Sequence, residues 1–86
     1  MPDANKHLKV TRTQTGVRIE SRMLKVLKAL AEYLDITLGD LIEGIVLYAF
    51  AGESPFSEEV LEKIEALKAV YGMDYDFTAS HRMLEE

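Results

Sequence analysis

Side chains alternate between two sides along residues 9–19. One side carries β-branched residues, namely Thr11, Thr13, Thr15, Val17 and Ile19. The other side is polar and basic, with Arg12, Gln14, Gly16 and Arg18. A period of two combined with β-branched residues predicts a short strand whose apolar face includes Val17 and Ile19.

Helical periodicity follows the predicted strand. Apolar residues recur every three or four positions over residues 21–34, which predicts an amphipathic helix with Ser21 as its N-cap. A second helix over about residues 38–51 follows the N-cap Thr37 and stops before Gly52. A third is expected over about residues 57–71. Residues 73–86 show no period, but aromatic residues alternate with acids at 74–77, so we expect this tail to dock.

The second helix is apolar around most of its circumference, and a chain of 86 residues is too short to cover it on all sides. A lone strand also leaves its backbone N–H and C=O groups unpaired. Both features predict a homodimer in which the strand pairs with its copy as a two-stranded antiparallel ribbon. The residues expected in the dimer core are Val17, Ile19, Leu27, Leu41, Ile42, Ile45 and Val46.

Composition and charge narrow the function. The chain is 48% hydrophobic and 29% charged, as expected of one small globular domain. It has no cysteine, which excludes disulfides and thiolate metal sites. The net charge of −5 is polarised: residues 1–30 carry seven basic and two acidic residues, whereas residues 31–86 carry three and thirteen. This asymmetry indicates an interaction surface at the basic end. Without a leader-like or membrane-spanning apolar stretch, we expect a cytoplasmic protein with no membrane contact.

The alternating TQTGVRI, the helix RMLKVLKALAEYL, the turn DITLGD and the helix LIEGIVLYAF together resemble the ribbon-helix-helix family of DNA-binding regulators. The resemblance implies a mainly α fold with one short N-terminal β-strand, an intersubunit ribbon in a homodimer, and here an added third C-terminal helix. Residues 1–8 would be a flexible basic arm, residues 9–51 the dimerisation and DNA-binding domain, and residues 52–86 a C-terminal helix and tail.

The outward side of such a ribbon fits the DNA major groove, where Arg and Gln pair with guanine and adenine edges. The resemblance gives the base-reading role to Arg12, Gln14, Gly16 and Arg18. It also implies phosphate contacts at the start of the second helix, from Thr37, Leu38 and Gly39. Lys6 and Lys9 are further phosphate candidates, or simply solvated charges. The family usually has glycine where this chain has Asp35, and Gly16 offers no side chain for base reading.

These observations predict a sequence-specific regulator of transcription, a repressor, whose partners are double-stranded DNA and its own copy, up to higher-order assembly on DNA. The alternative is a protein-interaction module, or an antitoxin whose acidic C-terminal half binds a partner protein. No nucleophile–base arrangement or phosphate-binding glycine loop is present, so we expect no enzyme and no cofactor. Asp74 and Asp76 lack the rest of a calcium loop, and we expect no metal.

Overall fold

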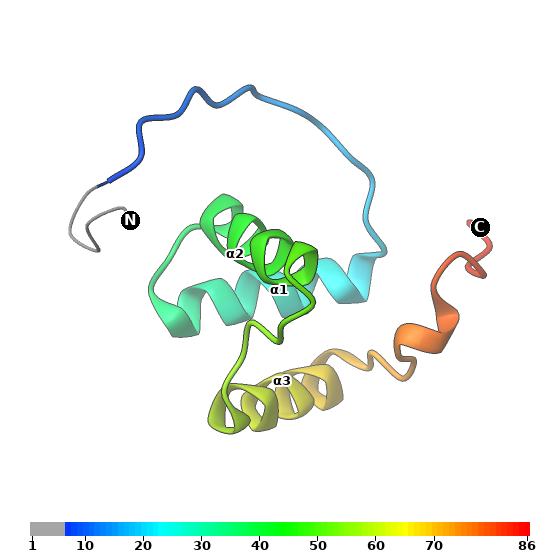
Figure 1. The fold of residues 1–86 in the computed structure, drawn as a ribbon. Helices are drawn as coiled ribbons and strands as arrows, with labels where there is room; N and C mark the ends of the chain where they lie inside the picture. Colours follow the sequence, from blue (N-terminus) through cyan, green and yellow to red (C-terminus); the bar gives the residue numbers. More distant parts are fainter. Residues whose placement is uncertain (1–6) are drawn as a thin grey trace.

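The computed structural model describes residues 7–86, and its regular elements are helices. Helix α1 spans Ser21–Leu34, α2 spans Leu38–Phe50 and α3 spans Glu58–Tyr71 (Figure 1). A short 3₁₀ helix, η1, follows at Phe77–Ala79. The three α-helices begin and end within one residue of the predicted positions, so the apolar periodicity located them correctly.

Residues 9–19 do not form the predicted strand. They run as a long open arch over α2, and the described residues contain no β-strand (Figure 1). No backbone hydrogen bond joins residues 7–19 to another described residue. Side-chain alternation alone does not hold a strand, because a strand needs a ladder of backbone hydrogen bonds to a neighbour. The prediction of a ribbon-helix-helix fold with an intersubunit β-ribbon was therefore wrong, and the described chain is all-helical.

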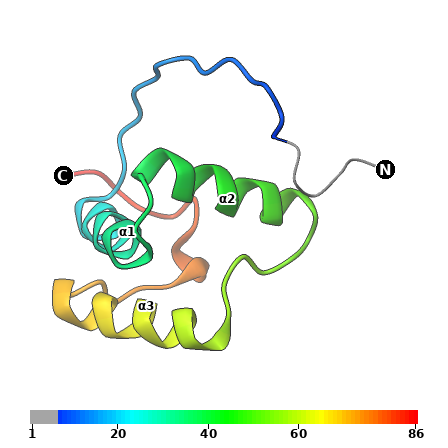
Figure 2. The same cartoon turned by 90° about the vertical axis from the view of Figure 1, so that its left-hand side faces the viewer.

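Helix α1 lies between the other two helices and packs against both (Figure 2). The centre of the core is formed by Leu30 and Ala31 of α1 and Leu41 of α2, which are 2%, 4% and 4% exposed. Partly buried apolar residues surround this cluster from all three helices and from the connection before α3: Leu27, Leu34, Ile45, Phe56, Val60, Ile64 and Leu67. The third helix therefore shares one core with the first two.

The helix ends are fixed by local side-chain and backbone contacts. Thr37 and Ser57 cap α2 and α3 by accepting from the N–H groups of the third helical residue. The N-cap of α1 is Glu20, whereas Ser21, the predicted cap, is the first helical residue. Glu20 replaces it because a carboxylate at this position accepts from the N–H groups of both Arg22 and Met23.

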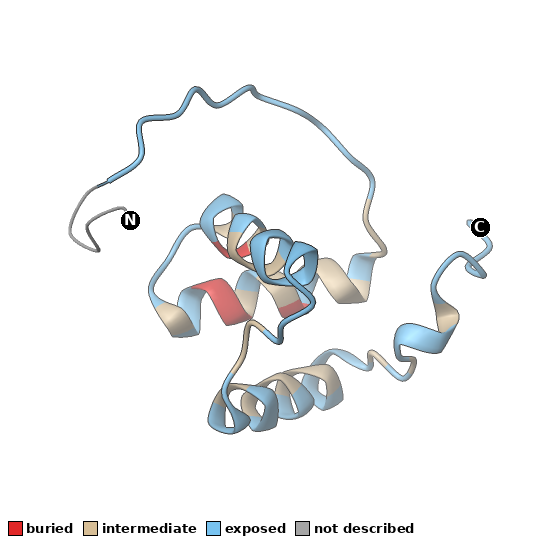
Figure 3. Cartoon of the chain, viewed as in Figure 1, coloured by how far each residue is buried: buried red, intermediate tan, exposed pale blue. Residues whose placement is uncertain are grey.

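The residues expected in a dimer core differ in how far they are buried within the chain. Leu41 is buried within its own chain, and Leu27 and Ile45 pack beside it. Ile19 and Ile42 are half-buried, whereas Val17 and Val46 are exposed. Exposure continues along the C-terminal half of α2, where Leu47, Tyr48 and Phe50 face outward (Figure 3). The chain thus leaves several apolar side chains of α2 uncovered.

Asp35 ends α1 in a left-handed backbone conformation, with φ of 58°, and its side chain forms no hydrogen bond or ion pair with another described residue. We expect Asp35→Gly to raise the free energy of unfolding by about 1 kcal/mol, because glycine adopts this conformation without a steric cost. For a domain of this size the melting temperature should rise by several degrees in circular dichroism. Asp35→Ala is the control and should lower the melting temperature. Equal melting temperatures for the two variants would contradict the role of the backbone angle.

Candidate nucleic-acid interface

The predicted base-reading residues lie on an exposed stretch, here called the basic segment and defined as residues 7–19. Lys9, Arg12, Gln14, Gly16 and Arg18 are all exposed along it. The segment arches from the N-terminal end of the described chain to the start of α1 (Figures 1 and 2). Lys6, the other predicted phosphate contact in the arm, lies outside the described residues. The basic side chains are therefore exposed to solvent, although no sheet organises them.

The start of α2 presents free backbone donors, as expected of a helix N-terminus. Thr37 Oγ1 accepts from the N–H of Asp40 at 3.1 Å. The N–H groups of Leu38 and Gly39 form no hydrogen bond with another described residue. Such groups attract anions, and the helix dipole adds to the attraction. Asp40 lies in the same first turn, however, and its carboxylate offsets part of that positive potential.

A hollow of about 1190 Å³ brings the two predicted parts of the site together. Arg12, Gln14 and Gly16 line it from the basic segment, and Thr37, Leu38 and Gly39 line it from α2. Apolar side chains complete the wall: Val17, Ile19, Leu24, Leu38 and Ile42. Lys9 and Arg18 do not line the hollow. The structure thus gathers most of the predicted contacts on one concave surface, but Lys9 and Arg18 lie outside it.

Each arginine of the basic segment is paired with an acid of the same chain. Arg12 donates from Nε and Nη2 to the two carboxylate oxygens of Glu43, at 2.9 and 2.8 Å. The hydrogen bond and the charge of Glu43 raise the pKa of Arg12, and Arg12 in turn lowers the pKa of Glu43. Arg18 forms an ion pair with Glu85 near the C-terminus. Sequence patterns gave no signal for these pairs, because both join residues distant in sequence.

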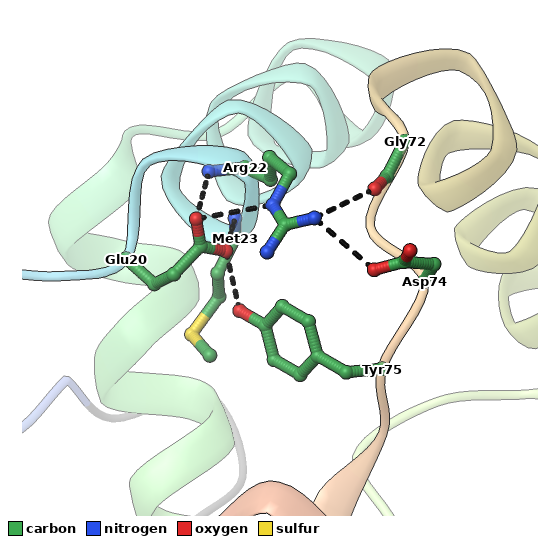
Figure 4. A network of polar contacts seen from close by, with 6 residues as sticks. All are labelled: Glu20, Arg22, Met23, Gly72, Asp74 and Tyr75. Atoms are coloured by element: carbon green, nitrogen blue, oxygen red, sulfur yellow. Dashed lines mark hydrogen bonds and ion pairs between the residues drawn. The ribbon is translucent and has the colours of Figure 1, made fainter. Parts of the chain in front are cut away.

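A second polar cluster lies at the junction of the basic segment and α1 (Figure 4). Glu20 accepts from the hydroxyl of Tyr75 at 2.5 Å and from the N–H groups of Arg22 and Met23 at 3.0 and 3.1 Å. The Tyr75 hydroxyl makes the largest contribution to lowering the pKa of Glu20, to about 2. Burial and the bond to Glu20 raise the pKa of Tyr75 to about 12. Both groups therefore keep the protonation states that this hydrogen bond requires over a wide pH range.

Arg22 joins the C-terminal tail to the same junction. Its guanidinium donates to Asp74 Oδ1 at 3.1 Å and to the carbonyl oxygen of Gly72 at 3.2 Å. It also lies 5.3 Å from the centre of the Tyr75 ring, in cation–π contact. Lys25 and Lys28 of the same helix are exposed, whereas Arg22 is half-buried. The prediction that the tail docks is confirmed, and its anchor is Tyr75.

Neither a cluster of metal ligands nor a membrane-spanning helix is found in the part of the chain that the structure describes. No group of three or more His, Cys, Asp or Glu side chains is arranged to hold a metal ion among residues 7–86. None of the described helices has the length and apolar character needed to cross a bilayer.

In comparisons with known proteins, no family model, curated protein or solved structure matches this chain.

The Glu20–Tyr75 hydrogen bond should make stability depend on pH at both extremes. We expect Tyr75→Phe to lower the melting temperature near neutral pH. Because the pKa of Glu20 falls from 4.5 to about 2 on folding, the difference from the unchanged protein should be full above 4.5 and shrink as pH falls toward 2. Because the pKa of Tyr75 rises from 10.0 to about 12, the difference should also shrink as pH rises through that range.

Melting curves by circular dichroism across pH measure this effect. Tyr71→Phe is the matched control, since the Tyr71 hydroxyl forms no hydrogen bond with another described residue. A difference between Tyr75→Phe and the unchanged protein that stays constant over the whole pH range would contradict the assigned hydrogen bond.

Proposed function

We propose that this chain is a homodimeric, sequence-specific double-stranded DNA-binding protein that regulates transcription, as a repressor acting in the cytoplasm. The observation that carries the proposal is the exposure of Lys9, Arg12, Gln14 and Arg18 on one open segment next to the free N–H groups at the start of α2. Cationic side chains and helix N-termini supply the phosphate contacts that dominate affinity for DNA.

Base recognition is assigned to three side chains of the basic segment. Arginine donates two hydrogen bonds to guanine, and glutamine pairs in the same way with adenine. Arg12, Gln14 and Arg18 are separated by even numbers of residues, two and then four, which places them on one side wherever the segment is extended. Lys9 and the N–H groups of Leu38 and Gly39 are assigned to phosphates, which fix the position of the protein on the duplex.

The second copy is assigned to the uncovered apolar side chains of α2. Phe50 is 84% exposed, and Val46, Leu47 and Tyr48 are also exposed beside it. Contiguous apolar surface of this kind is typical of protein interfaces. Dimerisation also doubles the number of basic segments, and two such segments contact more phosphates than one.

Capture of a partner protein is a second candidate function. The C-terminal tail exposes Phe77 and Leu84, which are 85% and 96% exposed, next to the acidic residues of the C-terminal half. An antitoxin would combine DNA binding through the basic segment with binding of a protein through this tail. The two functions use different segments of the chain, which the Arg18–Glu85 ion pair brings into contact.

Substitutions in the basic segment should separate base reading from phosphate binding. We expect Arg18→Ala to lower affinity for the preferred duplex by about 1–3 kcal/mol, with a much smaller loss for a scrambled duplex. Lys9→Ala should weaken binding to both duplexes alike. It should also reduce the slope of the logarithm of the binding constant against the logarithm of salt concentration by about one. Fluorescence anisotropy with labelled duplex from upstream of the chain's own gene measures both effects.

Lys28→Ala is the matched control for Lys9→Ala, because Lys28 is also an exposed lysine but lies on α1, outside the basic segment. If the unchanged protein is folded and dimeric but binds neither duplex, the DNA-binding proposal is overturned and partner capture becomes the leading function. Equal losses for Arg18→Ala on both duplexes would assign Arg18 to a phosphate.

Substitution of Phe50 should disrupt the dimer. We expect Phe50→Glu to convert a dimer of the 9.7 kDa chain into a monomer in light scattering, because burying a carboxylate in an apolar interface is costly. Helix content should be unchanged, since Phe50 lies outside the chain's own core. Val70→Glu is the control, as Val70 is also exposed but lies on α3. A dimer that persists in Phe50→Glu places the interface elsewhere.

A further inference from the structure

In the conformation that the structure shows, Glu43 occupies one side of the Arg12 guanidinium. Its Nε and Nη2 groups both donate to Glu43, at 2.9 and 2.8 Å. This two-point geometry is the one with which arginine binds a guanine edge or a phosphate. Glu43 of α2 therefore occupies the donors that the proposed function requires of Arg12.

Arg18 forms a single-contact ion pair with the other end of the chain. Its partner, Glu85, belongs to the C-terminal tail, which the Arg22–Asp74 and Tyr75–Glu20 contacts fasten to the start of α1. Both views show the C-terminal end near the point where the basic segment enters α1 (Figures 1 and 2). The anchor at Tyr75 thus keeps the carboxylate of Glu85 at a high local concentration around Arg18.

Both ion pairs lie in solvent, with side chains that are between about half and nine-tenths exposed. Exposed pairs of this kind contribute little to stability and open easily. Their main effect is competition, because a carboxylate and a phosphate oxygen bind the same guanidinium donors.

We propose that the basic segment is autoinhibited, and that double-stranded DNA binds only by displacing Glu43 from Arg12 and Glu85 from Arg18. This inference rests on the proposed function, since it assigns a competitor to each of two DNA-binding arginines. Because both ion pairs are weak, the inhibition is partial. The closely spaced phosphates of DNA displace Glu43 and Glu85, whereas isolated anions compete poorly.

Glu43→Gln and Glu85→Gln test the competition, in anisotropy titrations with the same duplex. We expect each substitution to raise affinity about threefold at low salt, and the double variant about tenfold. The gain should fade at high salt, which already weakens the intramolecular pairs. Glu62→Gln is the control for the change of one charge, since Glu62 is exposed on α3 and forms no ion pair with another described residue.

Gains no larger than that of Glu62→Gln, in a protein that binds the duplex, would overturn the autoinhibition and leave the DNA-binding function standing. If no variant binds any duplex, both proposals fall together.

A measurement without DNA tests the Arg12 contact itself. We expect the Nε–H proton of Arg12 to exchange with water more slowly in NMR spectra of the unchanged protein than in those of Glu43→Gln. Lys9 and Lys28 signals should not change. Equal exchange rates of the Arg12 proton in the two proteins would overturn the inference whatever the DNA titrations show.

Discussion

The packing of α1 between α2 and α3 is the constraint on which the rest of the structure depends. Leu30 and Ala31 of α1 are the centre of the core, and α2 and α3 reach it from different sides. Because α2 and α3 do not pack on each other, α1 is the element that fixes their relative position. A core this small buries little apolar surface, which leaves apolar side chains of α2 available for a partner.

The start of α1 connects this core to both ends of the chain. Glu20 caps the helix with its carboxylate and accepts the Tyr75 hydroxyl, and Arg22 binds the tail at Gly72 and Asp74. The C-terminal tail is therefore held at Glu20 and Arg22, directly after the basic segment ends. Any event that releases the tail changes the charge around the segment, although the helical core is untouched.

The sequence predicted the helices well because their determinants are local. The three-to-four-residue spacing of apolar residues, the caps Thr37 and Ser57 and the left-handed Asp35 all act within a few residues. The strand failed because its hydrogen-bonding partner cannot be read from its own side chains. The Arg12–Glu43 and Tyr75–Glu20 contacts span 31 and 55 residues, and no local pattern encodes such pairs.

The charge distribution explains why a chain of net charge −5 can offer a site for an anion. Most acids lie in the C-terminal half, and charges farther than about 8 Å are screened at physiological salt. The acids that matter for the basic segment are therefore the few that reach it, which are Asp40, Glu43 and Glu85. Under the proposed function, the affinity of the segment for DNA would therefore depend on these contacts more than on net charge.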